Sequence, residues 1–164
     1  MTTYMRYEEL PRELYQAMQA PDNVVKASGL SSTLLGLIRV RVSQINKCAY
    51  CLDMHLKEAL ASGESFQRLY SLSAWRETSY YSAQERAMLE WAEAVTLISE
   101  QNIPDSVYAE MMAHFDGPTI ARLTLAVIAI NGWNRLILSI KKEPGGYKPG
   151  FDFLNPTAAL SQKL

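Results

Sequence analysis

Residues 48–55 read CAYCLDMH, which places both cysteines of the chain close to a histidine. On an α-helix, residues three or four positions apart are neighbours on one face. Cys48 and Cys51 would then share a face, and His55 would lie one turn beyond Cys51. The surrounding pattern predicts such a helix from about Cys48 to Ala61. This segment is therefore predicted to hold two thiols and an imidazole together.

Helical periodicity continues on both sides of this segment. Ser82-Ala83-Gln84-Glu85 forms a capping box that opens a helix, and Pro104 and Pro118 are placed to begin two more. We therefore expect an all-α fold, a bundle of six to eight helices, with loop from Pro144 onward. The expected helices are Glu8–Ala20, Thr33–Asn46, Cys48–Ala61, Phe66–Ser73, Ser82 to about Ile98, Pro104 to about His114, and Pro118 to about Ile140.

Length and composition limit the class of protein. The chain has 164 residues, the usual size of one domain, and we expect a single domain over residues 1–164. A net charge of −1 argues against a protein that binds nucleic acid through phosphates. Two cysteines are too few for a disulfide scaffold, and the longest apolar stretch, Leu123–Ile130, is too short to cross a bilayer. We expect a cytoplasmic protein that binds neither nucleic acid nor membrane.

The two thiols and the imidazole are suited to a particular chemistry. If the helix begins near Cys48, its free N–H groups and dipole favour a thiolate. His55 could take the proton of Cys51, which could then attack an oxidised substrate, and Cys48 could close a disulfide. Two structural cysteines beside an incidental histidine are the simpler alternative. A zinc site needs four ligands. Besides Cys48, Cys51 and His55, the sequence offers only His114 as a further soft ligand, so we predict no metal.

Three segments of the chain resemble one family of proteins. They are residues 37–55, 85–96 and 123–135, and they look like the core of alkylhydroperoxidase D-like proteins of the carboxymuconolactone decarboxylase superfamily. The resemblance implies an all-α fold in homo-oligomers, commonly trimers or hexamers, and thiol-dependent peroxide reduction. Cys51 then matches the activated cysteine, Cys48 its disulfide partner and His55 the proton-relay histidine. No bound cofactor is expected, and turnover would need an external dithiol reductant, such as a dithiol carrier protein.

One position departs from the pattern of this family. The relay usually includes a glutamate twelve residues before the first cysteine, where this chain has Gly36. A substitute carboxylate could come from Glu58, one turn beyond His55, or from the helix that begins after Ser82. We favour Glu85 because a position at the edge of an apolar helix face could reach a site between helices. Glu90 and Glu93 lie further toward the polar side of the same helix.

Other polar residues fall on apolar helix faces. Arg41 is predicted to pair with a buried carboxylate or carbonyl group, because an unpaired buried charge is costly. Asn131 and Asn134 share one face of the last helix and are predicted to form structural hydrogen bonds across helices. Tyr50 lies between the cysteines and is predicted to pack or to form a wall of the site.

Three functions follow from these observations. The first is a thiol peroxidase or disulfide reductase that acts through Cys48, Cys51 and His55 on a hydroperoxide or on the disulfide of a partner protein. The second is a lyase of the decarboxylase type, in which His55 moves protons and the cysteines take no part. The third is a non-enzymatic stress protein whose cysteine pair senses oxidants. Activity after alkylation of both thiols would favour the lyase.

Overall fold

The computed structural model describes residues 4–150, which contain seven α-helices, two 3-10 helices and no strand. The predicted all-α bundle of six to eight helices is thereby confirmed. The elements in chain order are η1 (Tyr7–Glu9), α1 (Arg12–Ala27), α2 (Ser32–Ile45), α3 (Ala49–Ala61), α4 (Phe66–Ser71), η2 (Leu72–Glu77), α5 (Ala83–Thr96), α6 (Asp105–His114) and α7 (Gly117–Ser139).

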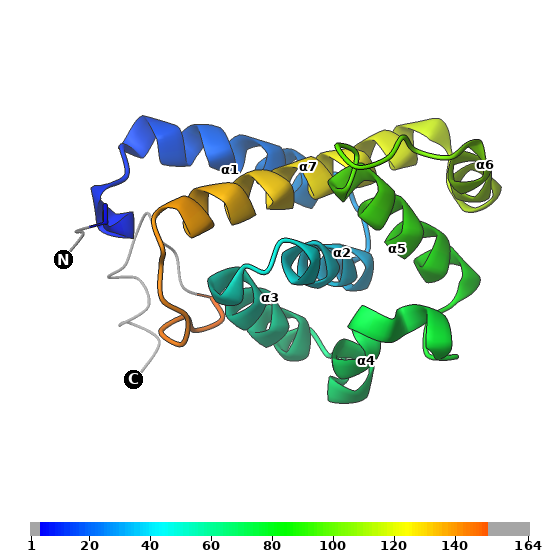
Figure 1. Ribbon diagram of the computed structural model, residues 1–164, viewed down its shortest axis with the longest axis horizontal. Coiled ribbons are helices and arrows are strands. Elements are labelled where there is room, and N and C mark those ends of the chain that lie inside the picture. Colours follow the sequence, from blue (N-terminus) through cyan, green and yellow to red (C-terminus); the bar gives the residue numbers. More distant parts are fainter. Residues whose placement is uncertain (1–3, 151–164) are drawn as a thin grey trace.

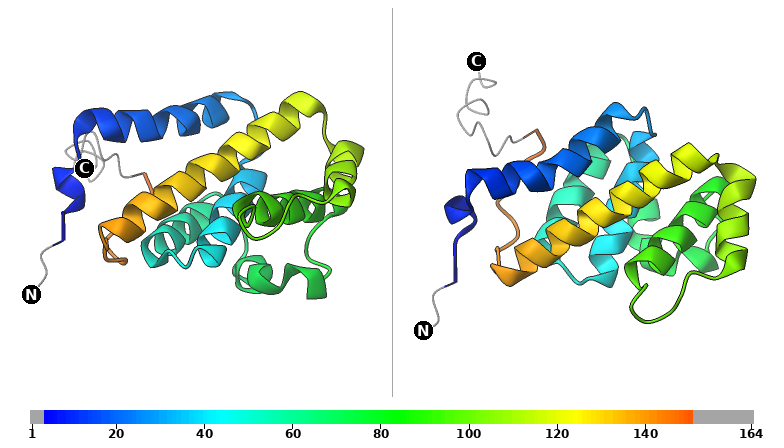
Figure 2. Two further views of the ribbon diagram at one scale, coloured as in Figure 1. Left: turned by 45° about the horizontal axis from the view of Figure 1, so that its top comes forward. Right: turned by 90° about the horizontal axis from the view of Figure 1, so that it is seen from above.

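Helix α2 is the centre of the bundle. It contacts α3, α5 and α7, and its side chains Leu37, Ile38, Val40 and Val42 are almost fully buried. The long helix α7 crosses the molecule and contacts both α1 and α2 (Figures 1 and 2). Burial of apolar side chains on both faces of α2 is the main contribution to stability in such a core. None of the helices within residues 4–150 is long and apolar enough to cross a membrane.

Two helices differ from those predicted. The break expected at Pro21 is absent, and α1 continues to Ala27. Proline weakens a helix interior, but tertiary contacts hold α1 on both sides of it, because Tyr15 and Val25 are both buried. The helix predicted over Phe66–Ser73 instead divides into α4 and η2.

The end of α5 also corrects a prediction. The helix is predicted to reach about Ile98, but its last helical residue is Thr96, and Ile98 is 57% exposed. The predicted capping box is confirmed, since Ser82 Oγ accepts the N–H of Glu85 and the Glu85 carboxylate accepts the N–H of Ser82.

The predicted partner of Arg41 is a carboxylate on α5. Arg41 Nε donates to Glu93 Oε1 over 2.7 Å, and Glu93 also accepts from Trp75 and Arg76. Burial acts to raise the pKa of Glu93, but these donors outweigh it and lower the pKa. Glu93 is therefore an ionised structural residue that joins α2, η2 and α5.

The chain after α7 returns to α3. Residues 144–150, which we call the C-terminal strap, are not helical and lie beside α3 in Figure 1. This agrees with the loop predicted from Pro144 onward, as far as the strap extends; residues 151–164 lie outside the described range. The strap brings a distant part of the sequence to the helix that carries the cysteines.

Candidate functional site

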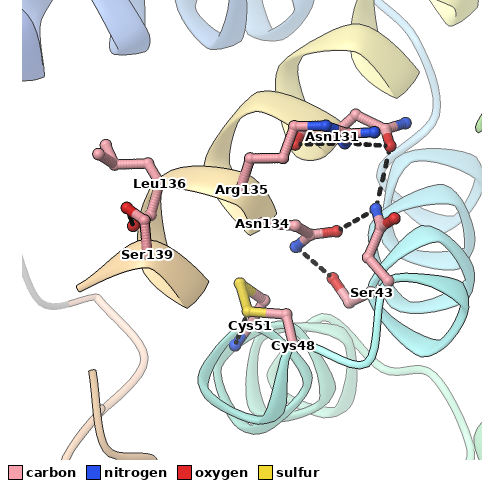
Figure 3. The surroundings of a disulfide bond; sticks show 9 residues. Ser43, Cys48, Cys51, Asn131, Asn134, Arg135, Leu136 and Ser139 are labelled. Atoms are coloured by element: carbon pink, nitrogen blue, oxygen red, sulfur yellow. Dashed lines mark hydrogen bonds between the residues drawn. A yellow bond between two sulfur atoms is a disulfide. The ribbon is translucent and has the colours of Figure 1, made fainter. Parts of the chain in front are cut away.

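A buried network of side-chain amides fixes the turn that precedes α3. Asn134 on α7 donates to Ser43 Oγ over 3.1 Å and accepts from Asn46 Nδ2 over 2.9 Å (Figure 3). Asn46 also donates to Asn131, which confirms the predicted role of both α7 asparagines in structural hydrogen bonds. Lys47 then adopts the left-handed conformation, with a φ of 58°, and turns the chain into α3.

Cys48 lies at the start of α3, as the sequence predicts. It is the N-cap residue, and its Sγ accepts the N–H of Cys51. The two cysteines are joined in a disulfide, so they are close enough to exchange between dithiol and disulfide (Figure 3). In the reduced state, the free N–H groups of the first turn and the helix dipole would favour a thiolate here.

Both cysteines are almost fully buried, but they differ in their contact with a cavity. Cys48 is 0% exposed and Cys51 is 2% exposed. Only Cys51 of the pair lines a cavity of about 500 Å³, and His55 lines the same cavity. Cys51 is therefore the sulfur that a small molecule in the cavity would meet first, with Cys48 behind it.

Glu58 fixes the orientation of His55. Its Oε2 lies 2.8 Å from Nδ1 of His55, on the same helix. With Glu58 ionised, Nδ1 carries the proton that it donates to the carboxylate. Nε2 is then the basic nitrogen of the ring, as a general base requires.

The environment of Glu58 keeps it ionised. Burial acts to raise its pKa, but the hydrogen bond and charge of His55, the Tyr147 hydroxyl and the charge of Arg39 outweigh it. The result is a pKa of about 2. Tyr147 belongs to the C-terminal strap, and its hydroxyl donates to Glu58 Oε1 over 2.7 Å. The carboxylate thus has a partner on each oxygen.

The structure does not bring Glu85 to the site, which corrects the preference for this residue as the relay carboxylate. Glu85 pairs with Arg68 on α4 and caps its own helix. Its edge of α5 faces α4 and not α3. Glu90 and Glu93 both lie beside Arg76, also away from the cavity. Of the four candidates, Glu58 is the one that contacts His55.

Gly36, where the family resemblance places a glutamate, lies against α3. A Cβ atom at Gly36 would lie 3.7 Å from Cβ of Ala59, the residue after Glu58. A side chain at position 36 would thus reach α3 from α2. Glu58 contacts His55 from within α3 itself.

Aromatic and apolar side chains form most of the cavity wall. Tyr50 lines it, as predicted, and so do Trp133 and Asp22, where the Trp133 indole donates to the Asp22 carboxylate over 2.7 Å. The volume is in the range of small-molecule sites. Periodicity did not reveal the wall residues from other elements, because they come from η1, α1, α2, α7 and the strap: Tyr7, Tyr15, Arg39, Trp133 and Tyr147.

No group of three or more potential ligands among residues 4–150 is placed to hold a metal ion. The second histidine, His114, lies at the end of α6 and contacts Glu110. It is not a residue of the cavity wall.

Comparisons with known proteins agree with this fold and place the chain in a family. The model of the carboxymuconolactone decarboxylase family matches residues 12–94. The uncharacterized protein YdfG of Bacillus subtilis is 38% identical over 140 residues, which cover 85% of this chain and 95% of YdfG.

Solved structures agree as well. An Agrobacterium tumefaciens protein of unknown function, described as a candidate antioxidant defence protein AhpD, has a TM-score of 0.84 and 39% identity over 89% of this chain and 100% of its own. A peroxidase-related protein of Silicibacter has a TM-score of 0.74 and 26% identity over 85% of this chain and 74% of its own. The chain is therefore an AhpD-like member of the carboxymuconolactone decarboxylase family.

Proposed function

We propose that the protein is a thiol-dependent peroxidase that reduces a hydroperoxide or, by thiol–disulfide exchange through a mixed disulfide, the disulfide of a partner protein. The observation that carries the proposal is the arrangement of three side chains. Cys51 and His55 line one cavity, and Cys48 is bonded to Cys51 from the buried side. A nucleophile, its base and its disulfide partner are thus in the order that the reaction needs.

The first step is attack of Cys51 on the hydroperoxide. In the reduced protein, His55 Nε2 takes the proton of the Cys51 thiol. The thiolate then attacks the terminal oxygen, the O–O bond breaks, and Cys51 becomes a sulfenic acid. The leaving alkoxide takes the proton back from His55 and departs as an alcohol. Sulfur is oxidised by two electrons, and the peroxide is reduced by the same two.

The second step forms the disulfide. The Cys48 sulfur attacks the Cys51 sulfur, the new S–S bond displaces the hydroxyl group, and the Cys48 proton leaves with it as water. An external dithiol, such as a dithiol carrier protein, then attacks the disulfide. It leaves Cys48 and Cys51 as thiols and becomes a disulfide itself.

Glu58 supports the proton transfers of the first step. It stays ionised, since its pKa is about 2. A carboxylate on Nδ1 holds the ring in one tautomer and stabilises the imidazolium that forms when Nε2 is protonated. Glu58 thereby performs the task that the resemblance assigns to a glutamate at the position of Gly36.

A peroxide-consumption assay tests the proposal. Reduced protein with excess dithiol should consume an alkyl hydroperoxide, and Cys51→Ser should lower the rate at least about 100-fold while the helical circular dichroism is kept. Equal consumption by the variant would refute the mechanism. Catalysis of lactone decarboxylation after both thiols are alkylated would favour the lyase. A disulfide that forms with peroxide but that no dithiol reduces would favour the sensor.

A further inference from the structure

The C-terminal strap is attached to α3 by its backbone. The carboxylate of Asp53 accepts the N–H of Gly145 over 3.0 Å. The ammonium group of Lys57 donates to the carbonyl oxygens of Gly145 and Tyr147 over 3.3 and 3.1 Å, and it also contacts Asp53. Asp53 and Lys57 are one turn apart on α3, so they hold the strap along the outer side of this helix.

These attachments place the Tyr147 side chain against Glu58. Tyr147 is buried, and its hydroxyl donates to Oε1 over 2.7 Å. The other oxygen, Oε2, faces Nδ1 of His55. The Glu58 side chain is 37% exposed, so its own burial does not prevent it from turning toward water. The bond from Tyr147 restricts this rotation.

We propose that Tyr147 is a positioning residue for the proton relay: it holds Glu58 in the orientation that keeps the carboxylate on His55. The expected effect of Tyr147 on turnover rests on the proposed peroxidase function. Tyr147, more than 90 positions after His55 in the sequence, thereby acts on this histidine through the Glu58 carboxylate that both residues contact.

The other groups that face Glu58 leave this role to Tyr147. Arg39 on α2 acts on Glu58 by charge, and its guanidinium lies 3.4 Å from Asp22 on α1. Tyr50 lies on α3 itself and lines the cavity. Hydrogen bonds to the two oxygens of Glu58 come from His55 and Tyr147. Among the hydrogen bonds to Glu58 within residues 4–150, only the one from Tyr147 comes from outside α3. Removal of the Tyr147 hydroxyl therefore removes this restraint.

A double-mutant cycle separates positioning from packing. Tyr147→Phe is made in the native protein and in the Glu58→Gln variant. Tyr81→Phe is made separately as a control. Tyr81 is the matched control, because it is also buried and its hydroxyl donates to the Arg68 carbonyl, away from the cavity. The rate constants measured are kcat/KM for an alkyl hydroperoxide and, in a Cys48→Ser background, alkylation of Cys51 by iodoacetamide.

We expect Tyr147→Phe to lower both rate constants about tenfold in the native background and less than twofold in the Glu58→Gln background. Tyr81→Phe should change neither rate by more than about twofold. Equal losses from Tyr147→Phe in the two backgrounds would overturn the proposal, since Tyr147 would then act without Glu58. No loss in the native background would overturn it as well.

A spectroscopic readout keeps the inference separate from the proposed function. Two-dimensional ¹⁵N spectra show which ring nitrogen of His55 carries the proton. The Nδ1–H tautomer should dominate in the native protein and lose population in Tyr147→Phe but not in Tyr81→Phe. An unchanged tautomer in Tyr147→Phe would refute the positioning role. If the native protein consumes no hydroperoxide, the proposed function fails, while the spectra and the alkylation rates still decide the role of Tyr147.

Discussion

Nδ1 of His55 lies 2.8 Å from Oε2 of Glu58, one turn further along the same helix. In the function proposed above, this contact takes the place of a glutamate on α2, where the chain has Gly36. A carboxylate three residues from its histidine needs no second helix to bring it into place. It does need a restraint against rotation, and the C-terminal strap supplies one through Tyr147.

Glu58→Gln should lower kcat/KM for an alkyl hydroperoxide about 10- to 100-fold, because an amide stabilises the imidazolium less well than a carboxylate. Steady-state peroxide consumption measures the effect. Glu85→Ala is the matched control: it removes the α5 capping box and the Arg68 ion pair, and should reduce stability by roughly 1 kcal/mol at unchanged kcat/KM. A larger loss of activity in Glu85→Ala than in Glu58→Gln would contradict the assignment.

The ionisation of Glu58 also predicts a dependence of stability on pH. Its folded pKa of about 2 lies below the unfolded value, so the ionised form stabilises the fold at neutral pH. That contribution should be lost as pH falls from about 4.5 toward 2. Because the side chain is 37% exposed, solvent screening reduces it to about 1 kcal/mol. Urea unfolding at several pH values measures it, and Glu58→Gln should lack this part of the acid dependence. Parallel profiles for the two proteins would contradict the prediction.

The two histidines of the chain offer a matched pair of variants. His55→Gln should slow alkylation of Cys51 at pH 7 at least tenfold, because the thiol loses its proton acceptor. His114→Gln removes an imidazole at the end of α6, outside the cavity, and should leave the alkylation rate unchanged. Iodoacetamide kinetics followed by mass spectrometry measures both. Similar rates in the two variants would show that His55 does not activate Cys51.

Asn134 should be the most costly polar residue to remove near the site. Asn134→Ala removes the donor to the buried Ser43 hydroxyl and one of the two acceptors of Asn46, and should destabilise the protein by roughly 2–3 kcal/mol. Arg135→Ala, on the exposed side of the same helix, should cost less than about 0.5 kcal/mol. Urea midpoints measure both. A cost at Asn134 no larger than that at Arg135 would mean that the amide network does not hold the turn before Cys48.

Much of this arrangement could be predicted from local sequence. The helix over the cysteines, its start at Cys48 and the capping box at Ser82 follow from spacing within one or two turns. The pairing of Arg41 follows from the cost of an unpaired buried charge, although its partner Glu93 is distant in sequence. Continuation of α1 through Pro21 could not be predicted, because contacts of Tyr15 and Val25 with the rest of the fold override a local signal.

The same contrast between local spacing and packing applies to the candidate site. Cys48, Cys51 and His55 lie on one helix, and their spacing alone brings them together. The choice of Glu85 over Glu58 failed because it relied on which edge of α5 would face α3, a question of packing between helices. Tyr147 gave no signal, since it lies in a loop and reaches Glu58 only when the strap returns to α3.

One measurement tests the peroxidase account most directly. Fully reduced protein is mixed in a stopped-flow instrument with one equivalent of an alkyl hydroperoxide, without added dithiol, and the products are identified by mass spectrometry. The account predicts one alcohol and one Cys48–Cys51 disulfide per chain, formed at least about 100 times faster than free cysteine reacts. A rate equal to that of free cysteine, or peroxide loss without the disulfide, would contradict it.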